Sequence, residues 1–137
     1  MTTVLVVESE RLVRDVVADR LDEAGYEVIA CPGPSAPNYT CIGTRGGRCP
    51  LEAAADVVVM DADLPGEDVA DAASGLDLLS HYTGVGKPLV ALRVPSDVLR
   101  LFAGERVLPL EWPPNTDALI RAIEESRAPS AAAVEEG

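Results

Sequence analysis

Residues 56–66 read Asp-Val-Val-Val-Met-Asp-Ala-Asp-Leu-Pro-Gly, and this stretch decides the fold. Its apolar run is too short for a helix and rich in Val, which is typical of a central strand in a parallel sheet. Asp61 follows that run directly and is followed by a Pro-Gly turn. Because ligands of open α/β sheets bind beyond the carboxyl ends of the strands, Asp61 is the first candidate functional residue. The plain alternative is an acidic residue that only leads the chain out of a strand.

Strand and helix patterns alternate along the rest of the chain. Strands are predicted at residues 3–7, 26–30, 56–60, 89–93 and 107–110. Helices are predicted over residues 12–21, ended by Gly25, around 75–82, from an N-cap at Ser96 to a stop at Gly104, and near the end of the chain. The apolar residues that mark the first and last helices are Leu12, Val13, Val16, Val17 and Leu21, and Leu119, Ile120 and Ile123. This alternation predicts an α/β fold with a parallel sheet covered on both faces.

Length and charge limit the possible functions. The chain has 137 residues, which suits one domain, predicted at 1–127. Its 11 Lys and Arg against 23 Asp and Glu give a net charge of -12, so we expect neither nucleic acid nor anionic membrane as a partner. No apolar stretch is long enough to span a membrane, and residues 1–3 lead into a strand without a charged leader. We therefore expect a cytoplasmic protein.

Two stretches interrupt the alternation. Residues 31–50 are rich in Cys, Gly and Pro, and residues 67–74 are acidic and rich in Ala. Each follows a predicted strand, so both insertions are expected at the same edge of the sheet as Asp61. The alternative is that surface loops tolerate insertions at low cost. The tail at 128–137 has little to bury and is expected to be disordered.

Three motifs resemble the receiver domains of bacterial response regulators. They are Val-Leu-Val-Val-Glu-Ser-Glu at 4–10, Leu-Asp-Glu-Ala-Gly-Tyr-Glu-Val at 21–28 and Asp-Ala-Asp-Leu-Pro-Gly at 61–66. The resemblance extends over residues 2–127, and the third motif is the most specific. It implies a chemotaxis-receiver-like, three-layer flavodoxin-like fold with a doubly wound five-stranded parallel sheet of order 2-1-3-4-5. It also implies that Asp61 is the phosphoacceptor of a two-component system, with a histidine kinase or another regulatory protein as partner.

A magnesium ion is the cofactor that this chemistry needs. A carboxylate and a phosphoryl donor repel each other, so a divalent cation must hold the two anions together. Mg²⁺ takes oxygen ligands, usually one or two carboxylates together with waters and phosphate oxygens. The candidate ligands are Asp61, Glu8 and the backbone carbonyl of Asp63.

The resemblance fails at three functional positions. The family has a second acid where this chain has Ser9, a Thr or Ser where it has Arg93, and a Lys before Pro where it has Trp112. Such a site has lost most groups that would stabilise a transferred charge, so weak or absent phosphorylation is expected. Arg93 could instead pair with Asp61 or Glu8, although it could also point to solvent. Trp112 could fill the space of the missing lysine or could anchor a partner.

The three cysteines have three interpretations. Cys31, Cys41 and Cys49 lie in or beside the first insertion, and their spacing is not that of a short Cys-x-x-Cys zinc knuckle. With His81 as a fourth ligand they could hold Zn²⁺, two of them could form a disulfide, or all three could be reduced. His81 is more simply a surface residue.

Three functions follow from these patterns. The first is a stand-alone pseudo-receiver, not an enzyme, that acts in signal transduction through protein contacts, with a partner protein or a second copy of itself. The second is a phosphorylation-competent single-domain response regulator that uses Asp61 and Mg²⁺. The third is a redox or zinc sensor that uses Cys31, Cys41 and Cys49.

Overall fold

A computed structural model describes residues 2–8, 10–31, 53–61, 75–94, 96–102, 106–111 and 115–127. The strands are β1 (Thr3–Val7), β2 (Glu27–Cys31), β3 (Val57–Asp61), β4 (Leu89–Leu92) and β5 (Val107–Leu110). The helices are α1 (Arg11–Glu23), α3 (Gly75–Gly84), α4 (Ser96–Arg100) and α5 (Thr116–Arg127). Strands and helices alternate as the sequence predicts, except between β2 and β3, where residues 32–52 lie outside the described residues.

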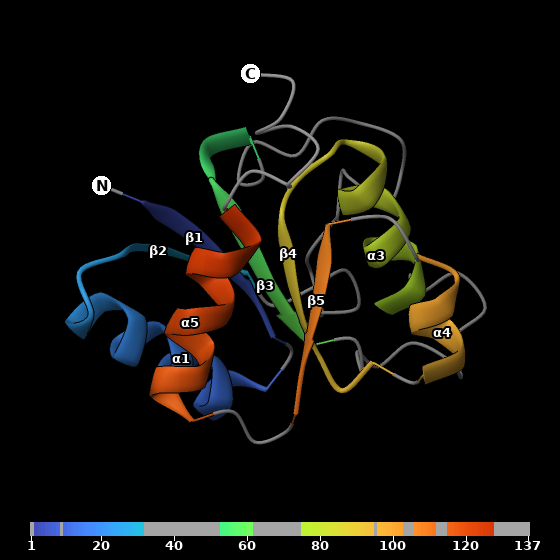
Figure 1. The fold of residues 1–137 in the computed structure, drawn as a ribbon. Helices are drawn as coiled ribbons and strands as arrows, with labels where there is room; N and C mark the ends of the chain where they lie inside the picture. The colour runs from blue at the N-terminus through green and yellow to red at the C-terminus, as the bar shows by residue number, and fades with distance from the viewer. Residues whose placement is uncertain are drawn as a thin grey trace.

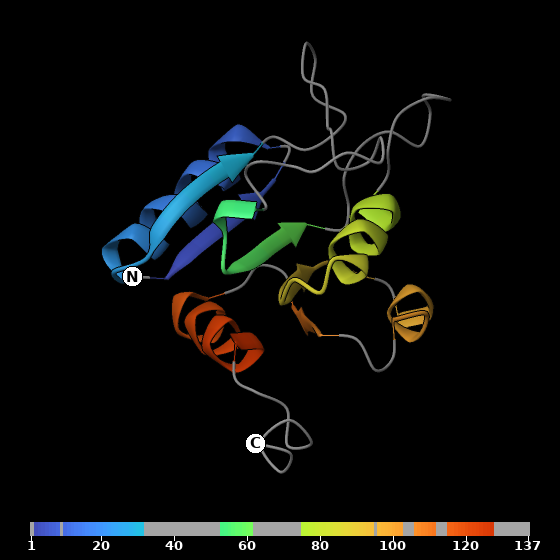
Figure 2. The same ribbon diagram turned by 90° about the horizontal axis from the view of Figure 1, so that it is seen from above.

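The strands form one parallel sheet of order β2-β1-β3-β4-β5 (Figure 1). This order confirms the predicted flavodoxin-like topology. Helices α1 and α5 cover one face of the sheet, and α3 and α4 lie on the other side (Figures 1 and 2). The strand order reverses between β1 and β3, and in sheets of this kind ligands bind beyond the carboxyl ends of the strands at such a point.

The central strands contribute alternate side chains to two apolar cores. Val57 and Val59 of β3 pack in the core beneath α1 and α5, whereas Val58 and Met60 pack in the core beneath α3. All residues of β3 and β4 are buried. A strand covered on both faces needs apolar residues at successive positions, which explains the uninterrupted run that precedes Asp61.

The first predicted helix is confirmed as α1, but two predicted bounds need correction. Within α1, Leu12 and Val16 are 79% and 49% exposed, because a helix on a sheet buries only one stripe, which here contains Val17 and Leu21. Strand β4 ends at Leu92 instead of residue 93, because the next residue leaves the strand conformation. Ser96 is the first residue of α4, not the residue before it.

Two chain reversals follow from identifiable residues. Gly25, with φ +98°, ends the turn after α1 in a left-handed conformation that side-chain-bearing residues rarely adopt, as predicted. Asn115 precedes α5, and its Oδ1 accepts the backbone N–H of Ala118 at 2.7 Å. Asn115 is therefore the N-cap of α5, and it had not been identified from the sequence.

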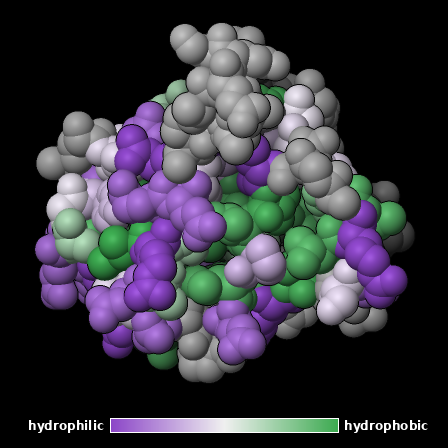
Figure 3. All heavy atoms as spheres, viewed as in Figure 1, coloured by the Kyte–Doolittle hydropathy of each residue, from purple (hydrophilic) through white to green (hydrophobic). Residues whose placement is uncertain are grey.

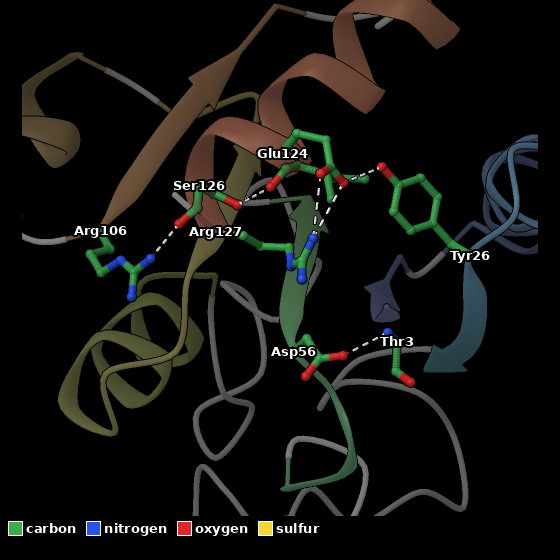
Figure 4. A network of polar contacts seen from close by, with 8 residues as sticks. Thr3, Tyr26, Asp56, Arg106, Glu124, Ser126 and Arg127 are labelled. Atoms are coloured by element: carbon green, nitrogen blue, oxygen red, sulfur yellow. Dashed lines mark hydrogen bonds and ion pairs between the residues drawn. The ribbon is translucent and has the colours of Figure 1, made fainter. Parts of the chain in front are cut away.

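Polar contacts fasten the amino edge of the sheet to α5 (Figure 4). The hydroxyl of Tyr26 donates a hydrogen bond to Glu124 at 2.6 Å, and Arg106 donates one to the carbonyl of Ser126 at 2.7 Å. Asp56, just before β3, accepts the backbone N–H of Thr3 at 2.8 Å. This network lies at the opposite end of the strands from Asp61, so the stabilising polar contacts and the candidate site are at different edges.

Several predictions lie outside the described residues. They concern most of the first insertion, all of the second insertion and the tail at 128–137. Both insertions and the division into one domain and a tail therefore stay predictions. Among the described helices, none combines the length and the apolar character needed to cross a membrane.

Candidate functional site

Two buried acids meet at the carboxyl edge of the sheet. Asp61 is the last residue of β3, and Glu8 follows the last residue of β1. The strands are neighbours in register, with Val7 opposite Met60, so the two acids leave the sheet side by side. Their exposed fractions are 1% for Asp61 and 2% for Glu8. Ionised carboxylates are rarely buried without a compensating partner, so the contacts of these two acids show how their charge is compensated.

Arg93 provides the positive charge for Asp61. Strand β4 pairs with β3 so that Leu92 lies opposite Asp61, and Arg93 follows immediately. The Nε of Arg93 donates a hydrogen bond to Oδ1 of Asp61 at 3.0 Å, and its terminal NH2 contacts Oδ2 in an ion pair. The guanidinium therefore contacts both carboxylate oxygens, the geometry that arginine forms best with carboxylates. Of the two partners considered from the sequence, Asp61 is the one that Arg93 binds.

The backbone of Arg93 is unusual. Its φ of +57° lies in the left-handed region, which is uncommon for a residue with a side chain. No other residue apart from glycine has a positive φ in the part of the chain that the structure describes. Residues in such conformations persist where the surrounding contacts determine them. At Arg93 this conformation coincides with the ion pair to Asp61, while 31% of the arginine side chain remains exposed.

Glu8 is held by its neighbours. Its backbone N–H donates to the carbonyl of Cys31 at 3.0 Å, and its carbonyl accepts a hydrogen bond from Arg14 at 2.9 Å. Its Oε1 accepts the backbone N–H of Glu10 at 3.1 Å. These contacts fix the position of the carboxylate beside Asp61. No sequence motif predicts the contact of Arg14 with Glu8, because it depends on how the side chain of a residue in α1 lies relative to the end of β1.

The second oxygen of Glu8 is buried and without a hydrogen-bond partner. Burial raises the pKa of Glu8 to about 7, helped by a hydrogen bond and by charge repulsion from Asp61 and opposed by the Glu10 amide and the Arg93 charge. Two ionised carboxylates have no proton to share, so Oε2 lacks a partner in that state. When Glu8 is protonated, it can donate a hydrogen bond to Asp61.

The observed arrangement does not fit a bound magnesium ion. Mg²⁺ needs carboxylate oxygens at about 2.1 Å. The guanidinium of Arg93 already contacts both oxygens of Asp61. The buried carboxylate oxygen that has no hydrogen-bond partner at this site is Glu8 Oε2. Over the described ranges, no group of three or more His, Cys, Asp and Glu side chains is gathered as a metal site would require.

The remaining candidate residues are only partly placed. Asp63, Ser9, Trp112, Cys41 and Cys49 lie outside the described residues. Cys31 is buried at the end of β2.

His81 lies in α3, half-buried, with its ring centroid 5.4 Å from that of Tyr82 in an edge-on arrangement. The zinc, disulfide and reduced-thiol interpretations of the cysteines therefore stay predictions.

Comparison with known proteins identifies the fold. No family model matches the chain, and no curated protein does. A receiver domain protein from Methanospirillum hungatei JF-1 superposes with a TM-score of 0.69 at 17% identity, covering 100% of this chain and 99% of the other. The receiver domain of a modulated diguanylate cyclase from Desulfovibrio desulfuricans G20 gives 0.67 at 20%, and one from Clostridium thermocellum gives 0.66 at 20%, each covering 93% of this chain and 94% of the other. The predicted receiver fold is confirmed.

Proposed function

We propose that this chain, which has the fold of response-regulator receiver domains, is a pseudo-receiver that acts in phosphorelay-type signalling through protein contacts. Asp61 is phosphorylated weakly or not at all. The observation that carries the proposal is the guanidinium of Arg93, which binds both oxygens of Asp61.

A phosphoryl acceptor needs an oxygen that can face the donor. It also needs a cation whose coordination shell can be shared with the phosphoryl oxygens. Asp61 is 1% exposed, and both its oxygens contact Arg93. Arginine neutralises the carboxylate, but it cannot do what the metal ion does. A metal ion coordinates the carboxylate and the phosphoryl oxygens at the same time, whereas a guanidinium only donates hydrogen bonds. Phosphorylation therefore requires that Arg93 first leave Asp61.

The sequence around the site supports the same conclusion. Ser9 stands where receivers have a second acid, and Trp112 stands where they have a lysine. Serine brings no negative charge for a cation, and tryptophan brings no ammonium for a phosphoryl oxygen. Even with Arg93 displaced, the site would stabilise a transferred phosphoryl group less well than a site with all these groups.

A function through protein contacts is supported by the surface around β5. This edge strand is only partly covered, and Val107, Leu108 and Leu110 are half-buried. Apolar surface extends over this region between α5 and α4 (Figure 3). Nearby, Leu101 is 71% exposed at the end of α4. Exposed apolar surface of this kind suits a protein partner, such as a histidine kinase or a regulatory protein, or a second copy of the chain.

The proposal is tested with acetyl phosphate. The wild-type protein and the Asp61→Asn variant are incubated with acetyl phosphate and Mg²⁺, and phosphoryl incorporation is followed by intact mass spectrometry and peptide mapping. The variant keeps the shape of the side chain but lacks the acceptor carboxylate. We expect the wild-type protein to incorporate no more phosphoryl group than the variant. Stoichiometric incorporation at Asp61 would overturn the proposal in favour of a competent response regulator.

A further inference from the structure

The position of Arg93 has a consequence for metal binding that rests on the proposed function. We infer that Arg93 and a divalent cation are alternative occupants of one acidic site. Mg²⁺ binds between Glu8 and Asp61 only when the guanidinium of Arg93 has left Asp61. The chain therefore carries its own resident cation, which excludes the metal while the ion pair is intact.

The charges of the three residues support this exclusion. When both acids are ionised, they contribute two negative charges and the guanidinium contributes one positive charge. Adding Mg²⁺ beside the arginine would leave an uncompensated positive charge among buried groups, whereas exchanging the arginine for Mg²⁺ leaves the site neutral. Burying a net charge is costly, so exchange of the two cations is favoured over joint binding.

The available oxygens lead to the same conclusion. Glu8 Oε2 is buried, has no hydrogen-bond partner and belongs to a side chain that interacts with Asp61. By itself, one carboxylate oxygen is a poor Mg²⁺ site. When Arg93 leaves, the guanidinium no longer contacts the two oxygens of Asp61, which lie beside Glu8. The displacement of one side chain thus creates a set of hard oxygen ligands of the kind that Mg²⁺ prefers.

The backbone of Arg93 provides a way for the guanidinium to leave. Its left-handed φ of +57° is unfavourable for a residue with a side chain, so a return to an ordinary conformation is favoured once the ion pair is broken. The side chain is already 31% exposed and can move into solvent, where its charge is hydrated. Departure of the guanidinium is therefore a local event at the end of β4.

The test is a titration with Mg²⁺ alone, monitored by calorimetry. Arg93→Gly removes the guanidinium from Asp61 and tolerates the positive φ, so it breaks the ion pair without straining the backbone. Arg100→Ala removes one positive charge from α4, where Arg100 is hydrogen-bonded to the carbonyl of Ser96 and not to Asp61, and serves as the matched control. We expect Arg93→Gly to bind Mg²⁺ at least tenfold more tightly than the wild-type protein, and Arg100→Ala to match the wild type. Equal affinity of Arg93→Gly and the wild-type protein would overturn the inference.

A second variant tests whether Mg²⁺ binds at Asp61. Adding Asp61→Asn to Arg93→Gly removes one of the two carboxylates, and the gain in affinity is expected to disappear. If the double variant binds Mg²⁺ as tightly as Arg93→Gly, the ion is bound elsewhere and the inference is wrong. Phosphorylation of the wild-type protein would contradict the proposed function. An unchanged Mg²⁺ affinity in Arg93→Gly, in contrast, would contradict only the exclusion of the metal by Arg93.

Discussion

Arg93 directly follows β4, and its guanidinium contacts both carboxylate oxygens of Asp61 at the end of the neighbouring strand β3. The partners differ in exposure, since Asp61 is 1% exposed and the arginine side chain 31%. Loss of the arginine would remove a counter-ion from a buried carboxylate, whereas the arginine itself can be hydrated. The ion pair therefore matters mainly because it compensates the buried charge of Asp61.

The Arg93→Ala variant is expected to lose stability. Removal of one partner of a buried ion pair leaves the other charge uncompensated, and a loss of roughly 2–4 kcal/mol in the free energy of unfolding follows from pairs of this kind. Urea denaturation at neutral pH measures it. The control Arg100→Ala should change the free energy of unfolding by less than about 0.5 kcal/mol. Equal stability of the two variants would show that Arg93 does not compensate a buried charge.

The Arg93→Gly variant separates the steric cost of the left-handed backbone from the loss of the ion pair. It loses the same ion pair as Arg93→Ala, but glycine adopts a positive φ without the steric penalty that alanine has. We therefore expect Arg93→Gly to be more stable than Arg93→Ala by roughly 1 kcal/mol, measured by the same urea denaturation. The reverse order would show that Arg93 does not hold a left-handed conformation in solution.

Glu8 makes stability depend on pH. Its pKa rises from 4.5 to about 7 on folding, so between these values the folded state holds a proton that the unfolded state has released. The stabilisation is complete below about pH 4.5 and is lost as pH rises through about 7. We expect the free energy of unfolding to fall by a few kcal/mol at most between pH 5 and pH 8 because of Glu8.

Urea denaturation of Glu8→Gln at both pH values isolates this contribution. Glutamine does not titrate but can still donate a hydrogen bond to Asp61, so the variant should show a smaller decrease between the two pH values than the wild-type protein. Glu10→Gln makes the same chemical change at an exposed position and should keep the wild-type decrease. An identical pH dependence in Glu8→Gln and the wild-type protein would show that Glu8 does not bind a proton more tightly in the folded state.

The Asp61→Asn variant is expected to loosen the segment after β4. The substitution removes the ion pair that coincides with the left-handed backbone of Arg93, so the segment leading to α4 should open more often. Hydrogen–deuterium exchange should be faster over residues 94–102 and unchanged in α5. The matched control is Asp56→Asn just before β3, where the negative charge is lost and the hydrogen bond from the Thr3 N–H is weakened instead. If both variants changed exchange equally over 94–102, the effect would not come from Arg93.

Tyr26 is expected to stabilise the contact between the amino edge of the sheet and α5. Burial, followed by the hydrogen bond to Glu124, raises the pKa of Tyr26 to about 12. Tyr26→Phe removes that hydrogen bond, and a loss of roughly 1–2 kcal/mol in the free energy of unfolding is expected from a bond to a charged group. Urea denaturation measures the loss, with the exposed Glu125→Gln as a neutral control. A Tyr26→Phe variant as stable as the control would contradict this role.

Much of the fold could be predicted because strand and helix patterns are strong here. The bounds of β1 and β5 agree with the prediction, and Asp61 lies at the end of a buried central strand. The exposure of Leu12 and Val16 could not be predicted from spacing alone. The apolar residues of α1 form a stripe wider than the sheet can cover. Which residues of that stripe are buried depends on how the helix packs on the sheet.

The site was harder to predict than the fold. The acids Glu8 and Asp61 follow from the ends of their strands. The parallel order allowed Arg93 to pair with one of them, but the sequence left open the alternative that Arg93 points to solvent. The left-handed conformation of Arg93 has no signal in the sequence, because glycine or asparagine normally marks such a position. The contact of Arg14 with the Glu8 carbonyl also depends on the relative placement of a helix and a strand, which residue types alone do not fix.

The most direct test of the central claim is an NMR measurement of the Arg93 side chain. Its Nε–H is hydrogen-bonded to Asp61, so the ¹H–¹⁵N signal of that group should be distinct from those of exposed arginines and its exchange with water should be slow. In Asp61→Asn the signal should move towards the position of exposed arginines and exchange faster. A rapidly exchanging, solvent-like Arg93 signal in the wild-type protein, unchanged in Asp61→Asn, would contradict the occupation of Asp61 by Arg93.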